Sequence, residues 1–287
     1  MDKILDGKAL SKTIRTEIKE KIDLIKEKTG ETIGLAIIQV GDDNASSTYV
    51  RNKTKACEEV GIDCYDYKFP VFTSTEEIHN LVLELNNTEC IHGILVQLPL
   101  PSHINATKII QSISYQKDVD CFNLHNIGCL YNGTPMFEPC TPAGIIELLK
   151  RNNIKIEGKE CVVIGRSNIV GKPLSYMLMR ENGTVTTAHS FTSNLFDVCK
   201  RADILVSAIG YPKVIDHKYI KKDTVIIDVG INRDMYGKLC GDVDFEKVYS
   251  KCSKITPVPG GVGPMTITML LNNCYKAYCY IKGINNK

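Results

Sequence analysis

The chain has 287 residues, of which 43% are hydrophobic and 24% are charged, a balance typical of a globular protein with one large domain or two ordinary ones. The formal net charge is only +2, and no stripe of Lys and Arg alternates with aromatic residues, which disfavours a nucleic-acid-binding role. No run reaches the roughly 18 apolar residues of a membrane span, and the polar N-terminus does not resemble a secretory signal.

The first half of the chain alternates strand-like and helical patterns. Residues 32–40 (TIGLAIIQV) are rich in β-branched side chains and end at a glycine, and residues 45–60 follow with helical periodicity. Residues 64–69 and 91–96 are predicted as further strands, with a helix over 75–87 between them. Near-continuous apolar strands separated by helices indicate a parallel sheet covered on both faces.

A second α/β block begins near residue 140, after an irregular link over 121–139 that contains several glycines and prolines. In its first helix, residues 140–152, Thr141 is a suitable N-cap and Pro142 stands at the first helical position. The pattern then predicts strands at 160–165, 184–189, 203–210 and 224–230, with helices at 171–182 and 193–201. This order is typical of a doubly wound nucleotide-binding fold. A final helix is predicted over 265–281.

The cysteines and histidines do not form a recognisable framework. Twelve cysteines are scattered without any C-x-x-C pair, and several, such as Cys161 and Cys274, stand in apolar segments. Without a secretory signal they are predicted to be reduced thiols in a cytoplasmic protein. The six histidines do not occur at metal-ligand spacing, so no metal site is predicted.

The turn after the predicted strand 160–165 has the features of a phosphate-binding turn. It reads Gly165-Arg166-Ser167-Asn168-Ile169-Val170-Gly171, and backbone N–H groups at a strand–glycine–helix junction can bind a pyrophosphate. The spacing is G-x-S-x-x-x-G rather than G-x-G-x-x-G, so an ordinary tight turn is the alternative.

The next strand indicates which dinucleotide would be preferred. A fold that prefers NAD usually places an acidic residue after the second strand, where it binds the ribose 2′-hydroxyl. Here that strand ends in Ala188-His189-Ser190-Phe191, without a carboxylate. Arg166 could instead bind a 2′-phosphate, which favours NADP, although a solvated loop arginine is the simpler alternative.

Three N-terminal segments carry polar side chains in unusual places. In Ser47-Thr48-Tyr49-Val50-Arg51-Asn52-Lys53, Tyr49 and Lys53 are four residues apart and share a helix face. Gln97 directly follows the apolar strand 91–96, before Leu98-Pro99-Leu100-Pro101, and ligand sites in α/β sheets lie at such strand ends. Lys117-Asp118-Val119-Asp120 places two carboxylates near the link. Taken singly, each segment is better explained as a helix surface, a strand-end amide or a solvated turn.

Taken together and in order, these segments resemble one known family. The shared segments are VGDDNASSTYVRNKTKACEEVGI, GILVQLPLP, KDVD, PCTPAGI, VVIGRSNIVGKP, DVGIN, GDVDF and ITPVPGGVGPMT. They cover nearly the whole chain and are similar to the bifunctional methylenetetrahydrofolate dehydrogenase/methenyltetrahydrofolate cyclohydrolases of folate one-carbon metabolism.

The resemblance implies an architecture and an assembly. It implies an N-terminal folate-binding α/β domain, residues 1–139, that faces a Rossmann-type NADP-binding domain, residues 140–265, across a cleft. It also implies that the C-terminal helix, residues 266–287, returns to the first domain. Members of the family are usually homodimers.

The resemblance further implies roles for individual residues. Lys53 would be the catalytic lysine, Tyr49 would stack over the folate, and Gln97 would hydrogen-bond near the lysine and tune its protonation. Asp120 would accept from the N–H groups of the pterin, a pairing that suits a carboxylate. The substrate site would also include Leu98, Pro99 and Pro264, the last in a loop over 259–266 that borders both ligands. The NADP site would be lined by Gly165, Arg166, Ser167, Ser190 and Ile231.

One position departs from the family pattern. The family usually continues KDVD with Gly-Phe, whereas Cys121-Phe122 stands here. A Cβ at this position would shift Asp120 if the family glycine has a positive φ, with a consequence for pterin affinity.

The activity implied is the oxidation of 5,10-methylenetetrahydrofolate by NADP⁺, followed by hydrolysis of the methenyl product to 10-formyltetrahydrofolate. The hydrolysis needs proton transfers, for which a lysine whose charged form is disfavoured by burial is suited. Three alternatives are a monofunctional dehydrogenase without hydrolase activity, a dehydrogenase acting on shikimate or an amino acid, and a non-catalytic folate- or nucleotide-binding protein.

Overall fold

The computed structural model describes residues 3–42 and 44–284. The chain divides into two compact units: a first unit of Thr13–Cys140 and Ile267–Lys287, and a second unit of Met1–Lys12 and Thr141–Thr266. The expected substrate domain, residues 1–139, included the first dozen residues. They group with the second unit because Leu5 N donates to Ile255 O and Ile255 N donates to Lys3 O, both at 2.8 Å.

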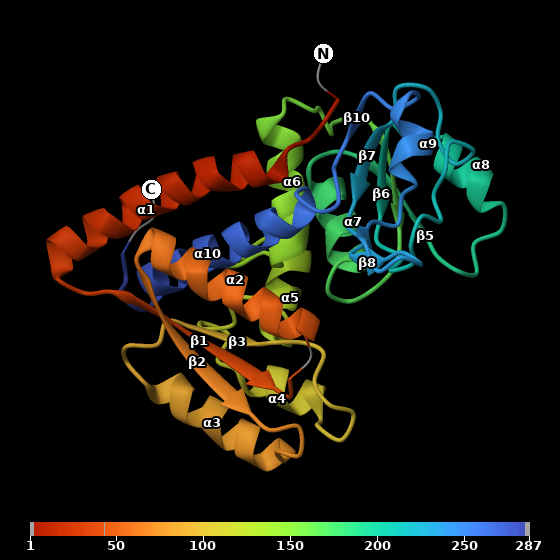
Figure 1. The fold of residues 1–287 in the computed structure, drawn as a ribbon. Coiled ribbons are helices and arrows are strands. Elements are labelled where there is room, and N and C mark those ends of the chain that lie inside the picture. The colour runs from red at the N-terminus through yellow and green to blue at the C-terminus, as the bar shows by residue number, and fades with distance from the viewer. Residues whose placement is uncertain (1–2, 43, 285–287) are drawn as a thin grey trace. The chain divides into compact units, whose positions relative to one another are not determined.

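The first unit contains a parallel three-stranded sheet in the order β2-β1-β3 (Figure 1). The strands are β1 (Ile33–Val40), β2 (Ile62–Phe69) and β3 (Gly93–Val96). Every residue of the central strand β1 is buried, which explains why its sequence is apolar at every position but Gln39 rather than alternating.

Helices cover this sheet, and Figure 1 shows α2 and α3 on opposite faces of it. The helices that lie wholly or mainly in this unit are α1 (Gly7–Thr29), α2 (Asn44–Val60), α3 (Thr75–Asn87), α4 (Ala106–Ser112), α5 (Leu124–Tyr131) and α10 (Val262–Ile281). Side chains of α3 and α4 pack with β1 and β3 in one apolar core. A capping box starts α3, because Ser74 Oγ accepts from Glu77 N while the Glu77 carboxylate accepts from Ser74 N.

The helix α5 was not predicted from the sequence, which indicated only an irregular link over 121–139. Its eight residues include Gly128, and their composition resembles that of a loop. The helix forms because Asn123 provides an N-cap, with its side chain accepting from His125 N at 2.9 Å. Tertiary packing then buries Asn126 and Leu130.

The second unit contains a parallel five-stranded sheet in the order β10-β7-β6-β4-β5. Its strands are β4 (Glu160–Ile164), β5 (Thr184–Ala188), β6 (Ile204–Ser207), β7 (Val225–Asp228) and β10 (Lys254–Ile255). The associated helices are α6 (Cys140–Arg151), α7 (Gly171–Arg180), α8 (Leu195–Lys200) and α9 (Phe245–Tyr249), and β8 (Asn232–Arg233) pairs with β9 (Leu239–Cys240) in an antiparallel hairpin.

This sheet order places β5 and β6 on either side of β4, so the strand order reverses next to β4. Such a reversal is the point at which doubly wound folds bind dinucleotides. The predicted α/β fold class, with a Rossmann-type unit, is therefore confirmed. Within the described part of the chain, no helix is both long and apolar enough to cross a membrane.

A buried histidine in the first unit gives the fold an expected pH dependence. His92 is 2% exposed, its Nδ1 accepts from Gly34 N at 3.1 Å, and its Nε2 has no hydrogen-bond partner among the described residues. Burial, together with the positive charges of Lys282 and Lys117, lowers the pKa of His92 from 6.5 to about 4. Protonation therefore favours the unfolded chain once the pH falls below 6.5.

We expect this histidine to destabilise the protein by about 2 kcal/mol between pH 7 and pH 5. Urea unfolding of the wild type and of His92→Asn at both pH values measures the effect, since an asparagine Oδ1 can replace Nδ1 as the acceptor. The variant should lose that part of the pH dependence, whereas His217→Asn, at an exposed position, should retain it. An identical pH dependence in His92→Asn and the wild type would contradict the assignment.

Candidate active site

Lys53 and Gln97 meet at the carboxyl end of the sheet in the first unit. Lys53 lies on α2 and is 7% exposed, and Gln97 directly follows β3. Lys53 Nζ donates to Gln97 Oε1 at 3.0 Å, while Gln97 Nε2 donates to the carbonyl of Leu98 at 2.7 Å. The second bond fixes the orientation of the amide, because only its oxygen can then face the amine.

Tyr49 lies one helical turn before Lys53 on α2. Lys53 Nζ is 5.6 Å from the centroid of the Tyr49 ring, which is within the range of a cation–π contact. Burial raises the pKa of the Tyr49 hydroxyl, and the negative charge of Asp120 adds to the effect. The start of α2 is held to the sheet by Gln39, whose Nε2 donates to Ser47 Oγ at 2.9 Å.

Asp120 is the carboxylate of this cluster, and its side chain is partly exposed. Burial raises the pKa of Asp120, whereas the positive charge of Lys53 and a hydrogen bond from Cys140 lower it. The cluster thus contains four kinds of polar group: the Lys53 amine, the Tyr49 phenol, the Gln97 amide oxygen and the Asp120 carboxylate. Such a set can bind a polar heterocycle and move protons.

The other two polar residues of the KDVD segment have structural positions. Asp118 is 1% exposed and accepts from Phe122 N, Asn123 N and Asn126 Nδ2. Lys117 Nζ donates to Leu85 O and Thr88 O at the end of α3. Two carboxylates that look equivalent in the sequence therefore have different surroundings.

Cys121 has the backbone conformation that favours glycine, with φ +62°. Its side chain is fully buried, and its thiol donates to Phe137 O at 3.5 Å. The departure from the family glycine therefore falls where a Cβ is disfavoured. Asp120, its neighbour, still lies within the electrostatic range of Lys53.

Asn273, a residue without a predicted role, supports the Asp120 segment. It is 2% exposed, and its Nδ2 donates to Val119 O at 2.8 Å and to Glu138 O at 2.9 Å. The signal in the sequence was an asparagine in the helix over 265–281, which is apolar on much of its surface. A buried amide in such a helix needs hydrogen-bond partners and commonly holds a neighbouring segment in place.

The glycine turn after β4 in the second unit has the geometry of a phosphate-binding turn. Gly165 has φ +122°, and a Cβ there would lie 2.4 Å from Ala208 O. A Cβ on Gly171 would lie 2.2 Å from Gly165 O, so neither glycine can be replaced without moving the backbone. Ser167 Oγ accepts from Val170 N and Gly171 N at the start of α7. The turn fits the pyrophosphate of a dinucleotide.

Arg166 and Ser190 lie at the carboxyl ends of the adjacent strands β4 and β5. The Arg166 guanidinium is 5.6 Å from the centroid of the Phe191 ring, and it forms no ion pair with a described residue. Both Arg166 and Ser190 are exposed. Because the guanidinium stacks on a ring, its N–H groups remain available to a phosphate.

The remaining expected site residues are spread over both units. Leu98 and Pro99 follow Gln97 in the first unit. Ile231 is 54% exposed in the loop after β7, and Pro264 stands in the first turn of α10, both in the second unit. The structure thus gathers Tyr49, Lys53, Gln97 and Asp120 in one unit, and the glycine turn with Arg166 and Ser190 in the other.

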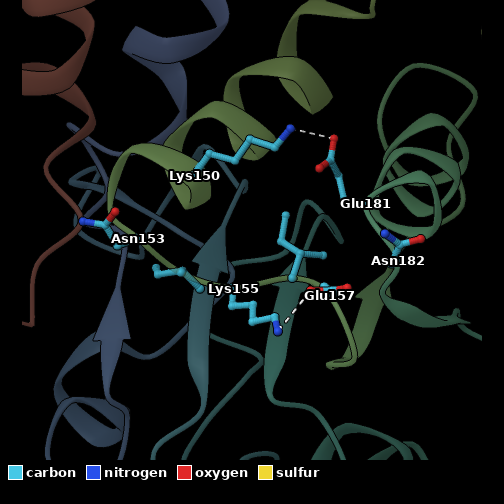
Figure 2. Close-up of a pocket in the computed structure, with 8 residues that line it drawn as sticks. Lys150, Asn153, Lys155, Glu157, Glu181 and Asn182 are labelled. Atoms are coloured by element: carbon cyan, nitrogen blue, oxygen red, sulfur yellow. Dashed lines mark hydrogen bonds and ion pairs between the residues drawn. The ribbon is translucent and has the colours of Figure 1, made fainter.

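An open pocket of about 520 Å³ lies elsewhere in the second unit, between the ends of α6 and α7 (Figure 2). The figure shows its polar side chains, with dashed lines for the ion pairs Lys150–Glu181 and Lys155–Glu157. The pocket is near the amino end of β4, whereas the glycine turn is at the carboxyl end. Since α/β sheets bind ligands at their carboxyl ends, we assign it no role. No group of three potential metal ligands occurs among the described residues.

Two models of one protein family match the two halves of the chain. The family model "Tetrahydrofolate dehydrogenase/cyclohydrolase, catalytic domain" matches residues 5–120, and the corresponding "NAD(P)-binding domain" matches residues 139–282. A relative from Agathobacter rectalis, "Bifunctional protein FolD", is 57% identical over 277 residues, which are 96% of this chain and 99% of that protein.

Solved structures show the same likeness over nearly the full length. The bifunctional enzyme FolD, a methylenetetrahydrofolate dehydrogenase/cyclohydrolase from Campylobacter jejuni, is 47% identical with a TM-score of 0.94, covering 97% of this chain and 99% of that chain. The Trypanosoma brucei enzyme, solved with NADP and an inhibitor, is 37% identical with a TM-score of 0.93, covering 97% and 98%. The resemblance noted in the sequence is confirmed, and the chain belongs to the tetrahydrofolate dehydrogenase/cyclohydrolase family.

Proposed function

We propose that this protein catalyses two consecutive reactions. The first is the NADP-dependent oxidation of 5,10-methylenetetrahydrofolate to 5,10-methenyltetrahydrofolate, and the second is hydrolysis of that product to 10-formyltetrahydrofolate. The observation that carries the proposal is the bond from buried Lys53 to Gln97, beside Tyr49 and Asp120, in a chain of this family. The first unit would bind the folate and the second the cofactor.

The folate would be held mainly by Asp120 and Tyr49. A carboxylate can accept from two N–H groups of the pterin at once, and the Tyr49 ring offers a flat apolar face. Leu98, Pro99 and Pro264 would complete the substrate site. Because Gln97 is fixed by its own bond to Leu98, it would keep the Lys53 amine in place beside the folate.

The cofactor would be held by the turn after β4, with Gly165 and Ser167 at the pyrophosphate, Arg166 and Ser190 at the 2′-phosphate, and Ile231 at the loop after β7. When bound, NADP⁺ supplies the two-electron oxidation of the one-carbon bridge. The protein's contribution to this step is to align the two ligands.

In the hydrolysis, water adds to the methenyl carbon of the cationic substrate, and a C–N bond then breaks to open the ring. Over the two steps the water oxygen loses both of its protons: one passes to the departing nitrogen, and the other is released to solvent as the positive charge of the substrate is lost. Lys53 Nζ is the basic group in the cluster that can take up a proton and return it. Its burial and its bond to Gln97 hold it at one position during both transfers.

A monofunctional dehydrogenase is the main alternative, and the intact set of Tyr49, Lys53 and Gln97 argues against it. A spectrophotometric assay with methylenetetrahydrofolate and NADP⁺ tests the proposed first step, and methenyltetrahydrofolate supplied alone tests the second. We expect NADPH to form in the first assay and the methenyl absorbance to decay faster than its uncatalysed rate in the second. Failure of either reaction would refute that half of the proposal.

Replacing Arg166 is expected to change the choice of cofactor. Arg166→Ala should lower kcat/KM for NADP about 10-fold, because a charge-assisted contact to the 2′-phosphate is lost, and should leave the value for NAD unchanged. The control is Arg201→Ala, which removes another exposed arginine of the same unit. An NAD preference in the wild type that the Arg166 substitution leaves unaltered would refute the assignment.

The assembly and location are part of the same proposal. We infer a homodimer in the cytoplasm that supplies one-carbon units for purine, methionine and histidine biosynthesis. All twelve cysteines carry free thiols, which suits a reducing compartment.

A further inference from the structure

Two buried aspartates lie at the carboxyl edge of the sheet in the second unit, next to the expected cofactor residues. Asp228 is the last residue of β7, and Asp242 follows β9. Asp228 is 4% exposed and Asp242 is fully buried. They belong to the DVGIN and GDVDF segments, and neither aspartate had a predicted role.

Asp242 ties together the two loops that leave β6 and β7. On the β6 side, its Oδ2 accepts from Ile209 N at 2.7 Å and from Ser207 Oγ at 3.1 Å, and its Oδ1 accepts from Gly210 N at 3.1 Å. On the β7 side, Oδ1 accepts from Asn232 Nδ2 at 2.9 Å. Four donors thus converge on one carboxylate, and two of them are backbone groups.

Asp228 in turn fixes the position of Asp242. Its Oδ1 accepts from Asp242 N, and its Oδ2 accepts from Val243 N, both at 2.9 Å. Its Oδ1 also accepts from Gly230 N at 3.1 Å. Burial raises the pKa of Asp228 to about 7, and the charge of Asp242 adds to the effect. Carboxyl groups are costly to bury unless hydrogen bonds satisfy them, and here backbone and side-chain donors of the two loops do so.

The glycines around the pair show how closely the loops approach it. A Cβ on Gly230 would lie 2.0 Å from Asp242 Oδ1, and a Cβ on Gly241 would lie 1.8 Å from Asp228 Oδ2. A side chain at Gly230 or Gly241 would therefore clash with one of the two carboxylates. The loops that they order lie on the β6–β7 side of β4, whereas Arg166 and Ser190 lie on the β4–β5 side.

We infer that Asp242 is a positioning residue for the nicotinamide end of the cofactor, acting through the loops at Ile209–Gly210 and Ile231–Asn232. This inference rests on the proposed function in so far as the cofactor is NADP. In a doubly wound fold the two halves of a dinucleotide lie on opposite sides of the strand-order reversal. With the 2′-phosphate at the β4–β5 side, the nicotinamide falls to the β6–β7 side.

Asp242→Asn tests the inference because an amide cannot accept from all four donors. Whichever way it is turned, its NH₂ group faces donors that the carboxylate oxygen had satisfied. Calorimetric titration should show the Kd for NADP and the Kd for NAD both rising about 10-fold, with their ratio unchanged. Arg166→Ala, by contrast, should change the ratio.

The cyclohydrolase reaction provides an internal control. Its proposed catalytic residues, Lys53 and its neighbours, are in the first unit, so Asp242→Asn should hydrolyse methenyltetrahydrofolate at the wild-type rate without any cofactor. Asp203→Asn is the matched control, since Asp203 accepts from Glu160 N at 3.0 Å at the amino edge of the same sheet, and it should leave both Kd values unchanged.

If Asp242→Asn does not fold, Asn232→Ala provides the second test. This variant removes one of the four hydrogen bonds to the Asp242 carboxylate, and Asn232 is only partly buried. The variant should raise both Kd values about 3-fold. The inference would be overturned if a folded Asp242→Asn or Asn232→Ala protein kept the wild-type Kd values. It would also be overturned if the ratio of the Kd for NADP to the Kd for NAD changed, or if cofactor binding and hydrolysis were lost equally. A wild type that binds NADP without oxidising methylenetetrahydrofolate would refute the proposed function and leave this inference standing.

Discussion

Lys53→Met is expected to lower the rate of methenyltetrahydrofolate hydrolysis by at least about 100-fold, the typical contribution of a positioned acid–base group. Methionine keeps an unbranched apolar stem in the buried position of Lys53, but it can neither take up nor return a proton. The bond to Gln97 Oε1 is lost with the amine. NADP binding should persist, because the proposed cofactor residues belong to the second unit. The decay of the methenyl absorbance and a calorimetric titration with NADP measure the two properties.

Lys55→Met provides the matched control for this substitution. It makes the same chemical change on the same helix, at an exposed position two residues away. It should hydrolyse the substrate at the wild-type rate. Hydrolysis by Lys53→Met at the wild-type rate would show that Lys53 has no part in the reaction. An equal loss of hydrolysis rate in Lys53→Met and Lys55→Met would show that the effect is not specific to the cluster.

Asp120→Asn is expected to raise the KM for methylenetetrahydrofolate about 30-fold, since a hydrogen bond to a charged acceptor contributes roughly 1.5–3 kcal/mol. An amide presents one acceptor where the carboxylate presents two, and its NH₂ group would face the N–H groups of the pterin. The substitution also removes a negative charge near Lys53. Initial-rate measurements over a range of folate concentrations give the KM.

Asp118→Asn distinguishes a substrate contact from a structural one. Asp118 accepts from two backbone N–H groups and from Asn126, and burial raises its pKa to about 6. Its substitution should lower the free energy of unfolding while the folded fraction keeps a KM within about threefold of the wild type. If Asp118→Asn raised the KM and Asp120→Asn did not, Asp118 would be the substrate contact and Asp120 the structural residue, which would contradict the prediction.

The sequence was sufficient to predict the α/β fold class and most of the elements. Long buried strands such as β1 are almost entirely apolar because helices cover both faces of their sheet. The cluster of Tyr49, Lys53, Gln97 and Asp120 was not derivable from spacing alone. It required the resemblance, because residues from α2, the end of β3 and the KDVD turn meet only through the parallel order of the sheet.

Other features depended on tertiary contacts that no local pattern reveals. The two aspartates of KDVD differ only in what surrounds them, with Asp118 at backbone N–H groups and Asp120 near Lys53. The support from Asn273 reaches Val119 across 154 positions of sequence. The helix α5 forms from a loop-like composition because an N-cap and burial together outweigh weak intrinsic propensity.

The most direct test follows the products of both proposed reactions of the wild-type enzyme in one mixture. Methylenetetrahydrofolate and NADP⁺ are mixed with the enzyme, and NADPH, methenyltetrahydrofolate and 10-formyltetrahydrofolate are quantified over time. We expect 10-formyltetrahydrofolate to form in step with NADPH while the methenyl intermediate stays low. Accumulation of methenyltetrahydrofolate equal to the NADPH formed, with no 10-formyl product above the uncatalysed rate, would contradict the role assigned to Lys53 and its neighbours.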